Sequence, residues 1–235
     1  KMVGKTEVAL YGLAYSIGML VQLFISGMNS ALTPWMYSKI KKGDIRSMRK
    51  VLQLLSVVVV GIAVALMLIS PELVLIFGSP KYREAVYVIP PVAASVFFIF
   101  IYNILSMPQF YYEKTQFLMA ASMAAAGANV VLNFIFIRLF GYIAAGYTTL
   151  ACYMLYSVGH YIVSKRILVN EGIQENLMSP GFLVACSVFL IGASIICNLI
   201  FPYRILRYAI LLASAGLVFW KKELLQKTMA DIRKK

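Results

Sequence analysis

Charged residues are scarce in this sequence, and acidic residues are the scarcest. The 235 residues include 9 Asp and Glu, 22 Lys and Arg and one histidine, so only 13% of the chain is charged. A soluble domain carries about 25% charged residues, whereas here 61% of the residues are hydrophobic. This composition excludes a soluble globular protein and a disordered one. It predicts an all-α, polytopic membrane protein, because a helix needs about 20 apolar residues to cross a bilayer.

The residues that build most metal and catalytic sites are equally scarce. A single histidine, His160, cannot form a multi-histidine metal site, and Cys152, Cys186 and Cys197 have neither paired nor metal-ligand spacing. The sequence has no glycine-rich phosphate loop, zinc-protease motif or paired catalytic carboxylates. We therefore expect no metal, no cofactor and no enzymatic activity. Transport without covalent chemistry fits this inventory better.

Uncharged stretches divide the chain into about seven predicted transmembrane helices. These stretches are 8–38, 51–71, 85–112, 115–137, 139–164, 176–203 and 208–220. The last one is short, and it spans only if it starts near Ile205 with Arg204 and Arg207 reaching toward the interface. We expect residues 1–165 to form a core of five spans. Residues 166–235 then add two more helices and a basic tail.

Basic residues concentrate on one side of these spans. The segments 36–50, 113–114 and 165–180, together with the C-terminal tail, carry 15 of the 22 Lys and Arg residues. The positive-inside rule therefore predicts a cytoplasmic C-terminus and an external Lys1. The net charge of +13 is thus a topology signal and does not indicate nucleic-acid binding. Because the chain opens Lys1-Met2 and starts outside, we expect it to be a piece of a longer protein.

Neutral polar residues recur at helical spacing inside the spans. The stripe in the first span consists of Tyr11, Tyr15, Gly18, Gln22, Ser26, Asn29 and Thr33. Such a stripe either packs on other helices through hydrogen bonds or lines a wet cavity, and the sequence leaves both open. Similar faces occur in the third, fourth and fifth spans. The candidates for a cavity lining are Tyr15, Gln22, Asn29, Tyr102, Asn129, Asn133 and Tyr153.

Three further features of the spans bear on mechanism. No Asp or Glu lies deep inside a span, which argues against the buried carboxylate of an ion-coupled antiporter. The small residues of 120–128 predict close packing of the fourth span on another helix. His160 lies about one turn from Lys165, which favours a hydrogen-bonded residue at the interface, with proton relay as the alternative.

Short motifs carry a family resemblance. They are Ala31-Leu32-Thr33-Pro34-Trp35, Lys41-Lys42-Gly43-Asp44, Ile76-Phe77-Gly78, Lys81-Tyr82-Arg83-Glu84-Ala85, Val88-Ile89-Pro90, Leu132-Asn133 after Asn129, and Ala144-Ala145-Gly146 before Thr149. Their order resembles the C-terminal part of the polysaccharide biosynthesis flippases. These are the O-antigen and capsule exporters of the multidrug/oligosaccharidyl-lipid/polysaccharide superfamily. Ala144 and Gly146 depart from the family pattern, which usually has glycine and alanine there.

The resemblance implies a two-lobed helical transporter, of which this chain is the C-terminal lobe. The implied function is the flipping of an undecaprenyl-diphosphate-linked oligosaccharide across the bacterial inner membrane by alternating access. The implied partners are this substrate, membrane lipids and the missing N-terminal lobe. If that mechanism holds, the cations for the diphosphate belong to the absent lobe or to Arg83 and Arg138.

Two alternatives to this function stay open. The first is a cation-coupled multidrug antiporter of the same superfamily, and the lack of an intramembrane carboxylate counts against it. The second is a membrane glycan polymerase or ligase. The short loops count against an enzyme, because catalytic groups of such enzymes usually lie on sizeable loops.

Overall fold

The computed structural model describes residues 4–220, and this part of the chain is helical without strands. The elements are α1 (Lys5–Gly18), α2 (Leu20–Lys41), α3 (Ile45–Phe77), η1 (Pro80–Tyr87), α4 (Ile89–Tyr111), α5 (Gln116–Phe140), α6 (Ala144–Asn170), α7 (Pro180–Ile200) and α8 (Arg204–Trp220). The prediction of an all-α bundle is confirmed. The predicted basic tail lies outside the described residues.

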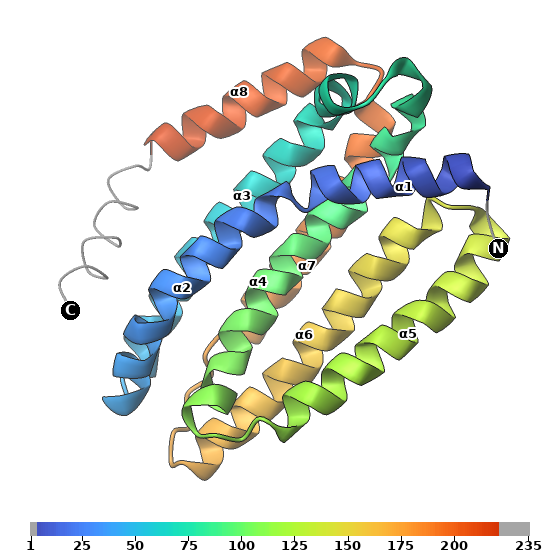
Figure 1. Cartoon of the computed structure of the whole chain (residues 1–235). Coiled ribbons are helices and arrows are strands. Elements are labelled where there is room, and N and C mark those ends of the chain that lie inside the picture. The colour runs from blue at the N-terminus through green and yellow to red at the C-terminus, as the bar shows by residue number, and fades with distance from the viewer. Residues whose placement is uncertain (1–3, 221–235) are drawn as a thin grey trace.

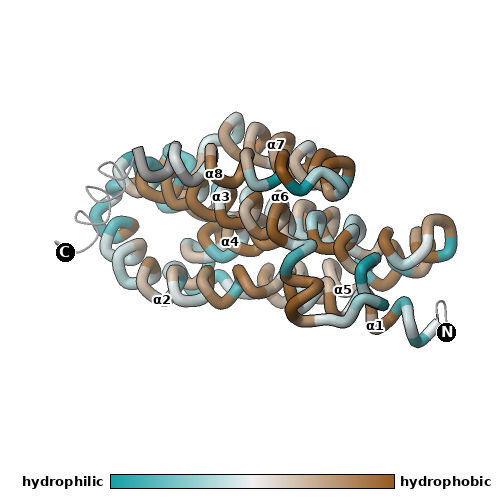
Figure 2. The backbone as a smooth tube through the Cα atoms, turned by 90° about the horizontal axis from the view of Figure 1, so that it is seen from above, coloured by the Kyte–Doolittle hydropathy of each residue, from teal (hydrophilic) through white to brown (hydrophobic). Residues whose placement is uncertain are grey.

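The helices form three layers. α7 and α8 lie on one face, α3, α4 and α6 lie in the middle, and α1, α2 and α5 lie on the other face (Figures 1 and 2). In Figure 2 the apolar residues, drawn in brown, dominate the helices. In the layer of α1, α2 and α5, helices α2 and α5 lie on opposite sides and α1 crosses near one end (Figure 1). In this view α4 and α6 of the middle layer lie between α2 and α5.

α4 is the central helix of the bundle. It packs against α1, α2, α3, α6 and α7, and Phe97 and Phe100 are fully buried in it. Two glycines let neighbouring helices approach its first turns. A Cβ atom on Gly18 of α1 would lie 2.5 Å from Val92 Cγ1, and one on Gly146 of α6 would lie 2.9 Å from Pro91 Cγ. Any larger residue at these two positions would therefore push α1 or α6 away from α4.

Within residues 4–220, five segments are long and apolar enough to cross a membrane, fewer than the seven predicted for the chain. They are Lys5–Lys41, α3, α4, α5 and α7. α6 has 27 residues and packs along α4 and α5, so it extends over the same depth, but its tyrosines, serines and glycines lower its hydropathy. α8 has 17 residues. α3 continues through Pro71 to Phe77, which makes it longer than the predicted span.

The first predicted span consists of two helices rather than one. α1 ends at Gly18 and α2 begins at Leu20, with a change of direction between them (Figure 1). At the break the Met19 N–H donates to the Tyr15 carbonyl at 2.9 Å, and the Gln22 N–H donates to the Met19 carbonyl at 2.9 Å. The break lies where Gly18 meets α4. It is not caused by a proline, since α2 continues through Pro34.

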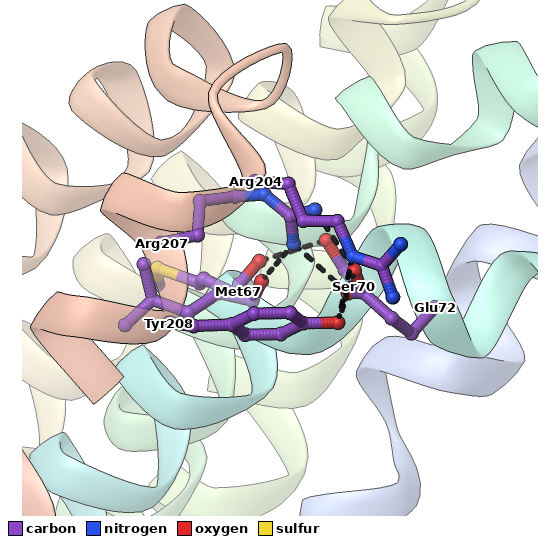
Figure 3. A network of polar contacts seen from close by, with 7 residues as sticks. Met67, Ser70, Glu72, Arg204, Arg207 and Tyr208 are labelled. Atoms are coloured by element: carbon purple, nitrogen blue, oxygen red, sulfur yellow. Dashed lines mark hydrogen bonds and ion pairs between the residues drawn. The ribbon is translucent and has the colours of Figure 1, made fainter. Parts of the chain in front are cut away.

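A buried ion pair joins α8 to the end of α3 (Figure 3). Arg207 Nη2 lies 2.8 Å from Glu72 Oε1, and Arg207 Nη1 lies 2.9 Å from Glu72 Oε2 and 2.6 Å from the Leu68 carbonyl. The Tyr208 hydroxyl donates to Glu72 Oε1 at 3.0 Å. Arg204 is exposed. Arg207, predicted to reach toward the interface, is instead buried and turns inward, where its two terminal nitrogens bond to Glu72 and to the Leu68 carbonyl.

Candidate functional site

A cavity of about 600 Å³ lies between α1, α4, α5 and α6. Five tyrosines from three helices line it, and we call it the tyrosine pocket. Its lining consists of Tyr11, Tyr15, Tyr102, Ser122, Ala125, Ala126, Asn129, Val130, Thr149, Cys152, Tyr153 and Tyr156. Within this lining, aromatic faces, hydroxyls and one amide are exposed to the cavity, and no side chain is charged.

Contacts between the tyrosine rings shape this pocket. The Tyr102 and Tyr153 rings are nearly parallel, at 4°, with centroids 6.3 Å apart, and the Tyr156 ring lies edge-on to Tyr102 at 4.7 Å. The Tyr11 hydroxyl lies 3.3 Å from Thr149 Oγ1, which ties α1 to α6. The Tyr156 hydroxyl lies 2.8 Å from Ser122 Oγ, which ties α6 to α5. These contacts fix the positions of the rings relative to one another around the pocket.

A second cavity of about 330 Å³ lies between α2 and α4, and we call it the amide pocket. Its lining consists of Gln22, Ile25, Ser26, Asn29, Ser30, Thr33, Tyr102 and Asn103. Tyr102 lines both pockets, so they adjoin at this residue. The amide pocket is more polar than the tyrosine pocket, because three carboxamide side chains and four hydroxyl side chains line it.

The polar stripe of the first span is divided between these two pockets. Tyr11 and Tyr15 on α1 face the tyrosine pocket, whereas Gln22 and Asn29 on α2 face the amide pocket. Gly18, between them, packs against α4. Some positions of the stripe therefore line a cavity, whereas Gly18 packs against a neighbouring helix. The break at Met19 separates the two parts.

Six of the nine predicted site residues line a pocket, and three do not. The six are Tyr15, Gln22, Asn29, Tyr102, Asn129 and Tyr153. Asn133 instead joins α5 to α6: its Nδ2 donates to Asn129 Oδ1 at 2.9 Å, and its Oδ1 accepts from the Thr148 hydroxyl. Asn133 thus belongs to the seam between the two helices.

The two arginines proposed for the diphosphate lie away from both pockets. Arg83 is exposed in η1. Arg138 is exposed in the last turn of α5, with its guanidinium 3.8 Å from the centre of the Phe134 ring. Within the described residues no group of three or more His, Cys, Asp and Glu side chains could hold a metal ion.

Sequence periodicity missed some residues of the site for understandable reasons. Thr149 and Tyr156 share the helical face of Tyr153, so the same spacing signal was available for them. Asn103 has no such signal, because it lies next to Tyr102 and reaches the amide pocket from an adjacent position on α4. α5 packs along α6, but the small residues of 120–128, for which close packing was predicted, are only partly covered or exposed. None of these residues is buried, and Ala125 and Ala126 line the tyrosine pocket.

One family model matches the sequence. It is the MatE model, and it matches residues 1–135, which is more than half of the chain. No curated protein and no solved structure gave a significant match. The matched region runs from α1 into α5 and includes both helices that line the amide pocket. MatE proteins export substrates across membranes, in agreement with the apolar helices and with the uncharged pockets. The chain belongs to the MatE family of multi-pass membrane transporters.

Proposed function

We propose that this protein flips an undecaprenyl-diphosphate-linked oligosaccharide across the bacterial inner membrane by alternating access. The observation that supports this most is the uncharged, tyrosine-rich lining of the tyrosine pocket. A sugar ring has apolar faces and an edge of hydroxyls. Tyrosine matches both, because it offers a large aromatic surface with a polar end. Ser122, Asn129 and Thr149 add hydrogen-bonding groups around the same space.

The remaining parts of the substrate need other surfaces. A diphosphate is bound best by Arg and Lys, and neither pocket has one in its lining. We assign this role to the N-terminal lobe of the transporter, or to Arg83 and Arg138 near the outer face. The prenyl chain stays among membrane lipids. In this proposal residues 1–165 form the transport core, residues 166–235 add two helices and a tail, and the C-terminus is cytoplasmic.

Flipping of a fluorescent lipid-linked oligosaccharide by the full-length protein in proteoliposomes tests the proposal. Tyr102→Ala removes the ring shared by both pockets, and we expect flipping to fall about tenfold or more, as for the loss of about 1.4 kcal/mol of binding energy. Tyr102→Phe removes only the hydroxyl, and its flipping rate should lie between those of Tyr102→Ala and the wild type. Tyr111→Ala is the matched control, because Tyr111 is on the same helix but lines neither pocket. Unchanged flipping in Tyr102→Ala would contradict the proposal.

One observation favours a second candidate, a cation-coupled multidrug antiporter. Tyrosine faces attract organic cations, and five tyrosines surround the same pocket. No carboxylate in either lining complements such a cation, which makes this the weaker candidate. Transport of an organic cation in the same proteoliposomes, without flipping of the lipid-linked sugar, would decide for the antiporter. A glycan polymerase or ligase is disfavoured by membership of a transporter family.

A further inference from the structure

An apolar groove of about 180 Å³ runs between α6 and α7 with α4 as its floor, and we call it the rear groove. It lies on the face of the middle layer that carries α7, whereas the tyrosine pocket lies toward α1 and α5 (Figure 2). α4 and α6 therefore separate the rear groove from the tyrosine pocket. The lining of the rear groove includes Phe98 on α4, Ser157, Val158 and Tyr161 on α6, and Pro180 and Val184 on α7.

The rear groove offers apolar contacts, because its hydroxyl groups are used within the protein or buried. The Ser157 hydroxyl donates to the Phe98 carbonyl at 2.9 Å, and the Ser187 hydroxyl donates to the Leu183 carbonyl at 2.7 Å. The Tyr161 hydroxyl is buried, and no residue of this lining is charged. A sugar has few groups to bond to in such a groove, whereas a hydrocarbon chain gains dispersion contacts along its walls.

A positively charged side chain lies at one end of the rear groove. Tyr161 and Pro180 line that end, next to the loop 171–179. Arg49 of α3 reaches the same loop, because its Nε donates to the Asn176 carbonyl at 2.6 Å. Arg49 also interacts electrostatically with Tyr161. The terminal nitrogens Nη1 and Nη2 of Arg49 have no hydrogen-bond or ion-pair partner among residues 4–220. Two nitrogens of the guanidinium are thus open to an anion.

The other charges at this end of the bundle leave it positive. Two carboxylates are paired, since Asp44 lies 2.6 Å from Lys39 and Glu171 lies 2.8 Å from Lys114. The remaining carboxylates, Glu113 and Glu175, are exposed and form no ion pair in the described part of the chain. Exposed cations on α3 and α6 include Arg46, Lys50, Lys165 and Arg166. Basic residues gathered at a membrane surface attract anionic lipid head groups.

We propose that the rear groove binds one anionic phospholipid, with an acyl chain between α6 and α7 and the phosphate against the Arg49 guanidinium. Arginine binds a phosphate through two parallel N–H···O bonds, and Nη1 and Nη2 of Arg49 are the donors for them. The lipid belongs to the leaflet at this end of the bundle, which is the cytoplasmic leaflet in the predicted topology. Its chain joins α7 to α6, in addition to the contacts of α7 with α3, α4 and α8.

The position of the rear groove argues against the transported lipid as its occupant. The tyrosine pocket lies on the other side of α4 and α6. An oligosaccharide attached to a lipid in the rear groove would therefore lie away from the pocket that we propose for the sugar. The phospholipid is instead a structural ligand that joins α7 to the transport core. This inference goes beyond the proposed function and holds for either candidate substrate.

The first test concerns the head group and uses native mass spectrometry of the full-length protein. The protein is released from micelles that contain equal amounts of phosphatidylglycerol and phosphatidylcholine with the same acyl chains. The wild type should retain one phosphatidylglycerol with a preference of about tenfold, as for one hydrogen bond to a charged group. Arg49→Gln should retain both lipids equally. Arg46→Gln removes an exposed arginine about one turn earlier on α3 and should keep the wild-type preference. No preference in the wild type, or an unchanged preference in Arg49→Gln, would overturn the proposal.

The second test concerns the acyl chain and leaves Arg49 in place, so it decides the matter even if Arg49→Gln does not fold. Val184→Trp fills the rear groove, and Val188→Trp, one turn later on α7 and outside the lining, is the matched control. These valines are 61% and 66% exposed, so neither substitution crowds the core. Val184→Trp should lower the amount of retained phosphatidylglycerol about tenfold, whereas Val188→Trp should retain as much as the wild type. Equal retention by the two variants would contradict the proposed site.

A competition experiment separates the phospholipid from the transported lipid. Undecaprenyl diphosphate, added in an amount equal to phosphatidylglycerol, should leave the retained phosphatidylglycerol unchanged in the wild type. Its displacement by undecaprenyl diphosphate would assign the rear groove to the transported lipid and refute the phospholipid as occupant. If the lipid-linked sugar is not flipped in proteoliposomes, the proposed function fails, whereas lipid retention by Arg49→Gln and Val184→Trp still decides the phospholipid site.

Discussion

Replacing Glu72 by methionine should destabilise the protein more than replacing Arg207, although both substitutions break the same ion pair. The Arg207 side chain is 4% exposed and that of Glu72 is 27% exposed. Glu72→Met therefore leaves a guanidinium buried with only the Leu68 carbonyl as acceptor. Removing one partner of a buried pair costs about 3–5 kcal/mol. Arg207→Met leaves a partly hydrated carboxylate that keeps the Tyr208 hydroxyl, and we expect a cost of about 1–2 kcal/mol.

A double-mutant cycle on the free energy of unfolding checks this reasoning. Reversible denaturation of the full-length protein in mixed micelles is followed by circular dichroism for the wild type, both single variants and the double variant. The double variant should be within about 1 kcal/mol of the wild type, because two apolar side chains of similar size often replace a buried pair without loss. Ile205→Met, at a residue 87% exposed on the same helix, is the control. Strictly additive losses in the double variant, or equal losses in the two single variants, would refute the argument.

Three other predictions concern a contact between helices, a hydrogen bond between helices and the membrane topology. Gly18→Val should lower stability by about 1–3 kcal/mol through overpacking against α4, whereas Gly12→Val, where a Cβ meets nothing within 4 Å, should not change the melting temperature. Asn133→Leu should lower stability by about 1–2 kcal/mol, because the Thr148 hydroxyl loses a partner between α5 and α6; an unchanged thermal melt would contradict this. A cysteine in place of Lys114 should react with an impermeant maleimide in inverted membrane vesicles but not in intact cells. The reverse labelling pattern would show that the predicted topology is wrong.

The helices were predictable because the bilayer imposes one strong requirement. Every backbone polar group in hydrocarbon needs an internal partner, so long uncharged stretches form helices. This argument found the regions of α3, α4, α5 and α7, with ends that differ by several residues. It overestimated the hydropathy of α6. This helix packs against α4 and α5, so it can carry tyrosines and serines that a lipid-facing helix would not.

The break between α1 and α2 and the inward turn of Arg207 could not be predicted. The break lies where Gly18 approaches Val92, which lies on another helix and far along the chain. The ion pair joins residues 135 positions apart. Helical periodicity describes one helix at a time, so it places a residue on a face but does not identify the helix opposite. Both features are consequences of how α4 and α8 pack.

The pockets also show which polar residues of a membrane helix are informative. Ser56 donates to the Leu52 carbonyl at 2.7 Å and Ser95 donates to the Val92 carbonyl at 2.6 Å, so each buried hydroxyl is satisfied within its own helix. A serine can therefore be buried at little cost and signals little about function. A carboxamide has two donors and an acceptor, more than one turn of helix can satisfy. Its remaining groups need a wet cavity, as at Gln22, or partners on a second helix, as at Asn133. Asn and Gln at helical spacing thus predict a cavity or a helix seam, and only the arrangement of the neighbouring helices decides between the two.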